Sequence, residues 1–307
     1  MSRPWIKSSN RSHCLPKTIV VTGARGQLGR ELQRSAPATV NLVSLDRAQL
    51  DISDAAAVES CLENHRPDWV LNAAAYTAVD RAESDEDQAT AINATGAVNL
   101  AAACARIGCR MVHVSTDFVF SGEAAHPYTP SSPTHPLGAY GRSKLAGERA
   151  VQAALPGAFI MRTGWVYSRS DANFVNTMLR LMRERDSLAV VCDQVGTPTW
   201  ARGLAEAIWA AVERPQLQGI YHWSDAGVCS WYDFAVAIAE EGLAAGLLSR
   251  PVAVLPIPAS DYPTPAQRPA FSVLDKQQSW HDLGLSPVHW RVQLRAMLQD
   301  LKDHGHD

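Results

Sequence analysis

The stretch TIVVTGARGQLGREL, residues 18–32, joins a β-branched run to a helix-like segment through three glycines. Gly23, Gly26 and Gly29 have the spacing G-x-x-G-x-x-G. Glycine lets the backbone turn tightly and approach a ligand, and a helix that begins there offers free N–H groups to a phosphate. Asp46 ends the next apolar run, about 20 residues on, where such sites bind a ribose hydroxyl. The stretch therefore predicts a dinucleotide site on the first strand-turn-helix unit.

Four further apolar runs repeat the pattern of the first one. They are VNLVSLD (40–46), DWVLNAAA (68–75), CRMVHVST (109–116) and AFIMRTGWVY (158–167), and helix-length segments separate them. Short runs that are apolar on both faces indicate strands of a parallel sheet covered by helices. We therefore expect an α/β fold with a doubly wound parallel sheet, the Rossmann architecture.

The pattern divides the chain into three parts. Residues 1–16 are basic and serine-rich, and we expect a disordered leader there. Residues 17–167 form the predicted dinucleotide-binding domain. Residues 168–307 include a proline-rich segment and are expected to form mainly a smaller substrate-binding region, with segments near 187–223 returning to the sheet. The junction between two such parts is a usual place for a ligand pocket.

Composition argues against several classes of function. The formal net charge is −3, so no strongly basic surface for nucleic acid or an anionic membrane is indicated. No apolar run approaches the ~18 residues that a membrane span needs, and the N-terminus lacks the apolar core of a secretory signal. The six cysteines follow no C-x-x-C or Cys/His pattern, which indicates reduced thiols and no metal site. We expect a cytoplasmic protein with a small-molecule partner.

The pair Asp46 and Arg47 leaves the choice between NADH and NADPH open. A carboxylate at this strand end usually repels the 2′-phosphate of NADPH, whereas the guanidinium of Arg47 offers that phosphate a partner. A second interpretation is that Asp46 caps the loop that follows it. Its position in the motif favours ribose binding.

A second group of residues points to carbonyl chemistry. Thr116 and Asp117 follow the fourth predicted strand, and PLGAYGRSKLAGE (136–148) places Tyr140 and Lys144 one helical turn apart. Ligands bind beyond the carboxyl ends of the strands in such a sheet, so these side chains should share one crevice. A tyrosine has an ordinary pKa near 10, and a nearby ammonium lowers it. The group predicts reduction of a carbonyl held by Thr116, with hydride from a nicotinamide and a proton from Tyr140.

The motifs TGARGQLG, STDFVFSG and YGRSKLAGE together resemble the extended short-chain dehydrogenase/reductases. Further stretches narrow the resemblance to the dTDP-4-dehydrorhamnose reductase family, among them RPDWVLNAAAYTAVDRAESD (66–85), RTGWVYS (162–168) and QRPAFSVLD (267–275). The resemblance implies reduction of the C4 ketone of dTDP-4-dehydro-L-rhamnose with NADPH or NADH, in dTDP-rhamnose and polysaccharide biosynthesis. It also implies a homodimer and, in some members, Mg²⁺ at the dimer interface.

The resemblance assigns roles to individual positions. The implied cofactor-binding residues are Gly23, Gly26, Gln27, Leu28, Gly29, Asp46, Asp51, Ile52, Ala73, Ala74, Ala75, Tyr140 and Lys144. The implied substrate-binding residues are Thr116, Asp117, Trp165 and Arg268, and the catalytic trio is Thr116, Tyr140 and Lys144. The chain departs from the family pattern at two positions, where Phe118 replaces the usual tyrosine and Phe271 the usual asparagine.

Several alternatives stay open at the level of sequence. Trp165 could belong to the core, and Asp51 could cap the helix that begins near residue 54. The chain could act as a reductase or epimerase of another nucleotide-sugar. It could also be a non-catalytic regulatory subunit, like the β subunit of methionine adenosyltransferase, although Tyr140 and Lys144 are both present.

Overall fold

The computed structural model describes residues 17–170 and 172–305, so the expected leader lies outside the described residues. Its centre is a parallel sheet with the strand order β10-β5-β4-β3-β1-β2. The strands are β1 (Lys17–Thr22), β2 (Val40–Leu45), β3 (Trp69–Asn72), β4 (Arg110–Thr116), β5 (Phe159–Thr163) and β10 (Gly219–His222). The predicted doubly wound α/β fold is confirmed.

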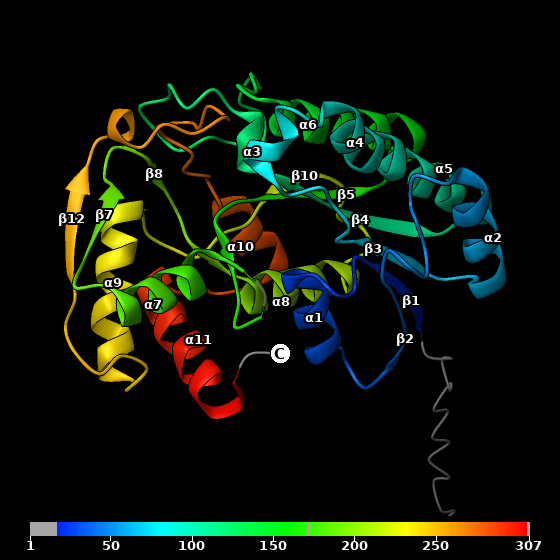
Figure 1. The fold of residues 1–307 in the computed structure, drawn as a ribbon. Helices are drawn as coiled ribbons and strands as arrows, with labels where there is room; N and C mark the ends of the chain where they lie inside the picture. The colour runs from blue at the N-terminus through cyan, green and yellow to red at the C-terminus, as the bar shows by residue number, and fades with distance from the viewer. Residues whose placement is uncertain (1–16, 171, 306–307) are drawn as a thin grey trace, which may run out of the picture.

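Helices cover both faces of this sheet (Figure 1). One face packs on α1 (Gln27–Arg34), α8 (Ala201–Val212) and α10 (Gln277–Leu283). The other face packs on α2 (Ala55–His65), α5 (Ala97–Ile107) and α6 (Ala139–Ala154). Successive residues of β1 show the alternation, because Ile19 and Val21 enter the first core and Val20 the second. Both faces are therefore buried, which accounts for the continuous apolar runs of the strands.

The sheet reverses its strand order between β1 and β3. β1 pairs with β2 on one side and with β3 on the other, and the chain then continues outward through β4 and β5. A crevice opens at such a point beyond the carboxyl ends of the strands. Between β3 and α5 the chain passes through α3 (Val79–Ala82), α4 (Glu86–Thr90) and a π-helical turn (Ala91–Gly96). These short elements border the crevice.

A second body of structure lies beside the sheet, on the left of Figure 1. It contains α7 (Phe174–Glu184), α9 (Trp231–Ala244) and α11 (Trp290–His304), whose apolar sides share one buried cluster. β7 (Ser187–Val191) pairs with β12 (Ala253–Ile257), apart from the main sheet. Short pairs join β6 (Val166–Tyr167) to β9 (Thr199–Trp200) and β8 (Val195–Gly196) to β11 (Cys229–Ser230). Within residues 187–223, β10 thus joins the main sheet and α8 packs on one of its faces, whereas β7 pairs elsewhere.

In the described part of the chain, no helix has the length and apolar character that crossing a membrane would require.

Candidate active site

A cavity of about 1260 Å³ lies between the main sheet and the second body. It receives side chains from the ends of β1, β3, β4 and β5 and from α6, α9 and the segment near residue 268. The predicted site residues that line it are Gly23, Gly26, Gln27, Leu28, Asp46, Arg47, Asp51, Ile52, Ala73, Ala74, Ala75, Thr116, Asp117, Tyr140, Lys144, Trp165 and Arg268. Gly29 is absent from this lining.

The glycine loop fits a bound diphosphate. Gly23 has a φ of +70°, and a Cβ there would lie 2.7 Å from backbone atoms of Ala73. α1 begins after Gly26 without a side-chain cap and without an acidic residue in its first turn. Its first N–H groups therefore retain their affinity for an anion. Gly29 serves packing instead, because a Cβ there would approach the Gly23 carbonyl oxygen to 2.2 Å.

Asp46 is more heavily engaged than the sequence indicated. Its Oδ1 accepts hydrogen bonds from the backbone N–H groups of Ala48 and Gln49, at 2.9 and 3.0 Å. Its Oδ2 lies 2.7 Å from Nε of Arg25, in the glycine loop. The carboxylate therefore does cap its own loop, the interpretation that sequence reasoning placed second. Its position on the cavity wall is also consistent with ribose binding.

The first turn of α6 presents Tyr140 to the cavity. The N-cap residue Gly138 has no side chain to cap the helix, and Glu83 takes over that function. Glu83 Oε1 accepts a hydrogen bond of 2.8 Å from the Ala139 N–H. A Cβ at Gly138 would lie 2.4 Å from the same oxygen, so glycine leaves room for this contact. Glu83 thus fixes the helix start directly beside Tyr140.

Electrostatics around Tyr140 favour the protonated phenol. Burial raises the pKa of Tyr140 to about 12, the Thr116 hydroxyl lowers it by hydrogen bonding, and the charge of Asp117 raises it. Asp117 is itself buried, and burial raises its pKa to about 6, against hydrogen bonds from Ser272 and Thr116. The sequence had predicted a phenol pKa lowered by Lys144, whereas the pKa is raised in this structure because burial dominates.

Lys144 lies almost fully buried behind Tyr140 on the same helix face, with 2% of its surface exposed. Its Nζ donates a hydrogen bond of 2.6 Å to the Val114 carbonyl of β4. Burial lowers the pKa of Lys144 to about 8, and the nearby Glu148 carboxylate opposes that shift. The ammonium is therefore held at the cavity wall and loses its proton near pH 8.

Trp165 belongs to an aromatic wall of the cavity. Its φ is 51°, a value that residues with side chains rarely adopt. Its ring stacks on Trp231 with centroids 3.4 Å apart, and Phe174 packs against Trp231 at 4.7 Å. A Cβ at Gly196 would lie 2.5 Å from the Trp165 ring, so the ring also fills the space above that glycine. Sequence reasoning missed Trp231 and Phe174, which no motif marks.

Arg268 reaches the cavity from the proline-rich segment and is held by Asp80 of α3. The pair is bidentate, with Nη1–Oδ1 and Nη2–Oδ2 distances of 3.0 and 2.9 Å. The Ala266 N–H also donates to Asp80. This Arg268–Asp80 ion pair connects the two sides of the cavity. Asp80 lies in a quoted family motif, but its role could not be read from sequence.

Comparison with known proteins identifies the family. The sequence profile described as "RmlD substrate binding domain" matches residues 17–303. The chain belongs to the RmlD family. A dTDP-4-dehydrorhamnose reductase of Burkholderia thailandensis is 42% identical over 92% of this chain and 98% of the relative. The spore coat polysaccharide biosynthesis protein SpsK of Bacillus subtilis is 41% identical over 92% of this chain and 97% of its own length.

A solved structure agrees with the RmlD assignment. The dTDP-4-dehydrorhamnose reductase of Bacillus anthracis, in complex with NADP, superimposes with a TM-score of 0.87 at 35% identity. The match covers 92% of this chain and 99% of that one. Among the described residues of this RmlD-family chain, no group of three or more His, Cys, Asp or Glu side chains suits a metal ion.

Proposed function

We propose that the protein is an NAD(P)H-dependent oxidoreductase that reduces the C4 ketone of dTDP-4-dehydro-L-rhamnose to dTDP-L-rhamnose. The observation that carries the proposal is that Thr116, Tyr140 and Lys144 share one cavity wall with the glycine loop. The 42% identity to a dTDP-4-dehydrorhamnose reductase over nearly its whole length selects this substrate. The product is a nucleotide-sugar for polysaccharide biosynthesis.

Three side chains of the protein have separate roles in the proposed reaction. When bound, NAD(P)H would supply the hydride that reduces the ketone carbon. Thr116 holds the ketone oxygen by hydrogen bonding, and Tyr140 gives that oxygen its phenolic proton. With a pKa of about 12, Tyr140 carries this proton throughout the neutral range. The charge of Lys144 favours the phenolate that remains, and Thr116 stabilises it further.

Residues on the opposite wall of the large cavity position the substrate. Arg268, aimed by Asp80, provides a guanidinium for the diphosphate of the nucleotide-sugar. Trp165, with Trp231 behind it, offers a flat apolar surface to the sugar ring. Phe118 packs edge-on against Tyr140 with centroids 5.6 Å apart, so this position contributes packing and no hydroxyl contact. A non-catalytic regulatory subunit would not require this complete set of catalytic and substrate-positioning residues.

The test is turnover with a defined substrate. Purified protein is supplied with dTDP-4-dehydro-L-rhamnose and NADPH or NADH, and loss of nicotinamide absorbance is followed beside other dTDP- and UDP-linked 4-keto sugars. Net oxidation of coenzyme distinguishes a reductase from an epimerase. Tyr140→Phe should lower kcat by about 10²-fold or more while coenzyme binding is retained. Folded protein that binds coenzyme and turns over none of these sugars would refute the proposal.

We also propose that the enzyme acts in the cytoplasm as a homodimer. The described cysteines Cys61, Cys104, Cys109, Cys192 and Cys229 are all free thiols, as a reducing compartment favours. The homodimer rests on family resemblance. Light scattering coupled to gel filtration measures the mass, and a strictly monomeric active species would exclude the dimer.

A further inference from the structure

One side chain at the glycine loop reaches across to the second body of the structure. Gln27, the first residue of α1, is half-buried on the wall of the large cavity. Its Oε1 accepts hydrogen bonds from Ser168 Oγ at 3.1 Å and from Asn173 Nδ2 at 3.0 Å. Ser168 follows β6, and Asn173 is the N-cap residue of α7. A single amide oxygen thus connects the glycine loop to the second body.

The hydrogen bonds of Asn173 fix the orientation of both amide groups. Its Oδ1 accepts a hydrogen bond of 3.1 Å from the Asn176 N–H and so caps α7, which leaves its Nδ2 as the donor toward Gln27. The Gln27 oxygen therefore faces Asn173. The Gln27 Nε2 makes no hydrogen bond within residues 17–170 and 172–305, so its two N–H groups are available to a ligand in the cavity.

The two donors to this glutamine adjoin the aromatic wall of the cavity. Ser168 comes three residues after Trp165, and Asn173 directly precedes Phe174. Phe174 packs on Trp231 with centroids 4.7 Å apart, and Trp231 stacks on Trp165 at 3.4 Å. The segments that the glutamine holds therefore carry the rings proposed to meet the sugar.

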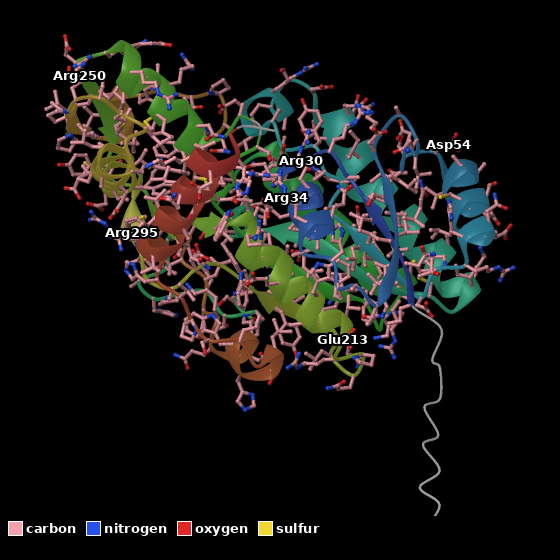
Figure 2. All side chains as sticks on the ribbon, turned by 90° about the horizontal axis from the view of Figure 1, so that it is seen from below. Arg30, Arg34, Asp54, Glu213, Arg250 and Arg295 are labelled. Carbon is pink, nitrogen blue, oxygen red and sulfur yellow. The ribbon has the colours of Figure 1, made fainter. Side chains whose placement is uncertain are left out.

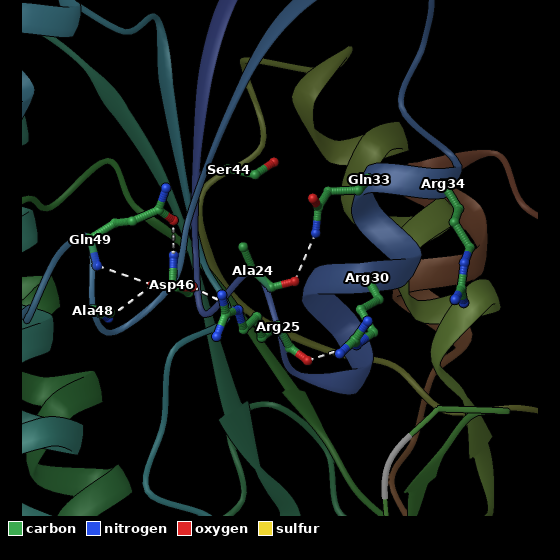
Figure 3. A pocket seen from close by; sticks show the side chains of 9 residues that line it. All are labelled: Ala24, Arg25, Arg30, Gln33, Arg34, Ser44, Asp46, Ala48 and Gln49. Atoms are coloured by element: carbon green, nitrogen blue, oxygen red, sulfur yellow. Dashed lines mark hydrogen bonds and ion pairs between the residues drawn. The ribbon is translucent and has the colours of Figure 1, made fainter. Parts of the chain in front are cut away.

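The outer side of the glycine loop is tied to α1 (Figure 3). The Ala24 carbonyl accepts a hydrogen bond of 2.7 Å from Gln33 Nε2, and the Arg25 carbonyl accepts one of 2.9 Å from Arg30 Nε. The loop and the first two turns of α1 therefore form one unit. A ligand that binds the loop and the free N–H groups of α1 also restricts Gln27, because this side chain starts from the same turn.

Restricting Gln27 once lowers the entropic cost of a second binding event. A glutamine side chain loses rotamer freedom when it is fixed in one position. When bound coenzyme has already fixed it, the aromatic wall is held in place before the nucleotide-sugar arrives, and the second ligand causes a smaller further loss. By thermodynamic linkage, the nucleotide-sugar then strengthens coenzyme binding by the same factor.

We propose that Asn173 is a positioning residue for the reduction, and that through Gln27 it makes the affinity for the nucleotide-sugar depend on bound coenzyme. The inference deepens the proposed function and rests on its two ligands. Asn173 acts on the sugar through Phe174 and the stacked rings, and Gln27 transmits the occupancy of the glycine loop. Neither side chain has a part in proton or hydride transfer.

The first experiment measures binding of dTDP-L-rhamnose to the full-length protein by calorimetry, with and without saturating NADPH. These two ligands cannot react with each other, because both are in the reduced form. NADPH should tighten binding of dTDP-L-rhamnose to the wild type about tenfold, the scale of one or two net hydrogen bonds.

Two variants test the connection itself. Gln27→Leu removes the amide, and Asn173→Ser keeps a helix-capping residue that is too short to reach Gln27. Ser168 Oγ retains the Ser170 carbonyl as a partner at 3.0 Å, so neither variant leaves it unpaired. Both should bind dTDP-L-rhamnose alone nearly as tightly as the wild type and lose the enhancement by NADPH. A purely structural role would weaken binding with and without coenzyme alike.

The second experiment needs no sugar. Hydrogen exchange in the first turn of α7, at the Asn176 N–H above all, should slow about tenfold when NADPH is added to the wild type, and should not change in Gln27→Leu. A protein that shows this protection and the enhanced sugar binding, but turns over no 4-keto sugar, refutes the proposed reaction and leaves this inference standing.

Arg295→Gln is the matched control. Arg295 lies in α11 of the second body, away from Arg34 of α1 in Figure 2, and its two hydrogen bonds to Glu241 measure 2.8 and 2.7 Å. This variant weakens the α9–α11 contact without touching Gln27, so it should keep the enhancement. Binding of dTDP-L-rhamnose to the wild type that NADPH leaves unchanged, or that stays unmeasurable with NADPH present, overturns the proposal. So does an enhancement that persists in folded Gln27→Leu and Asn173→Ser.

Discussion

The buried ammonium of Lys144 predicts a pH limit on activity. Its pKa is lowered to about 8 because burial penalises the charged form more than Glu148 favours it. The side chain is therefore charged below pH 8 and neutral above it. In the mechanism proposed above, loss of the charge removes the stabilisation of the phenolate that Tyr140 becomes after proton transfer. We expect kcat/KM to fall as pH rises through this value.

The size of the effect follows from the titration curve. At pH 7 roughly nine in ten Lys144 side chains are charged, and at pH 9 roughly one in ten. If only the charged form is active, kcat/KM falls about tenfold for each unit well above pH 8. Tyr140 does not set this limit, because its pKa of about 12 keeps it protonated over the whole range.

Unfolding of the protein at high pH would not produce the same fall in kcat/KM through the titration of its buried lysines. An unfolded lysine holds its proton up to about pH 10.4, so between pH 8 and that value the unfolded chain binds more protons. The lowered pKa of Lys144 therefore makes the free energy of unfolding rise over this interval. The same sign applies to Lys276, a second buried lysine whose pKa burial also lowers to about 8.

Lys276 provides the control for the assay. Initial rates with NADPH and the nucleotide-sugar are measured from about pH 6 to about pH 10, with thermal midpoints at each pH. Lys144→Met should lower activity and abolish the inflection near pH 8. Lys276→Met should retain it, because Lys276 lies outside the lining of the large cavity. A wild-type profile that stays level to about pH 10, or an inflection that persists in Lys144→Met, would refute the reasoning.

Three further substitutions test the cavity walls. Asp117→Asn should raise the thermal midpoint at neutral pH, because the raised pKa of Asp117 means that its charged form costs stability, on the order of 1–3 kcal/mol. Scanning calorimetry should find this gain absent near pH 4, where the folded protein carries Asp117 protonated and therefore as neutral as asparagine. A gain independent of pH would contradict this account. Asp80→Asn should raise KM for the nucleotide-sugar about tenfold with little change in the NADPH dissociation constant, since it frees Arg268 from its bidentate partner. Trp231→Ala should also raise this KM, by roughly three- to tenfold, because it removes the ring on which Trp165 stacks; unchanged steady-state constants would exclude a role for the stack.

Local patterns in the sequence were sufficient to predict the sheet and many of the residues that line the large cavity. The glycine loop occupies one strand-turn-helix unit, so its geometry depends on residues that are adjacent in the chain. Tyr140 and Lys144 share a helix face because four residues make about one turn. The carboxyl ends of parallel strands then bring Thr116 and the loop to the same edge.

Other features depend on contacts that only the folded chain makes. Arg25 compensates Asp46 across the gap between β1 and β2, and Asp80 holds Arg268 from a distant part of the sequence. The left-handed backbone of Trp165 is accommodated by packing against Trp231. No periodicity encodes these pairings, because they depend on how separate elements pack together.

The sequence by itself thus determined the class of sheet, the glycine loop and the placement of Tyr140 and Lys144 on one helix face, since periodicity and short spacing act within single elements. Tertiary structure alone decided the charge balance at Asp46 and the direction of the Tyr140 pKa shift. Both depend on burial and on side chains from separate segments, because desolvation and Coulomb energies are set by three-dimensional surroundings.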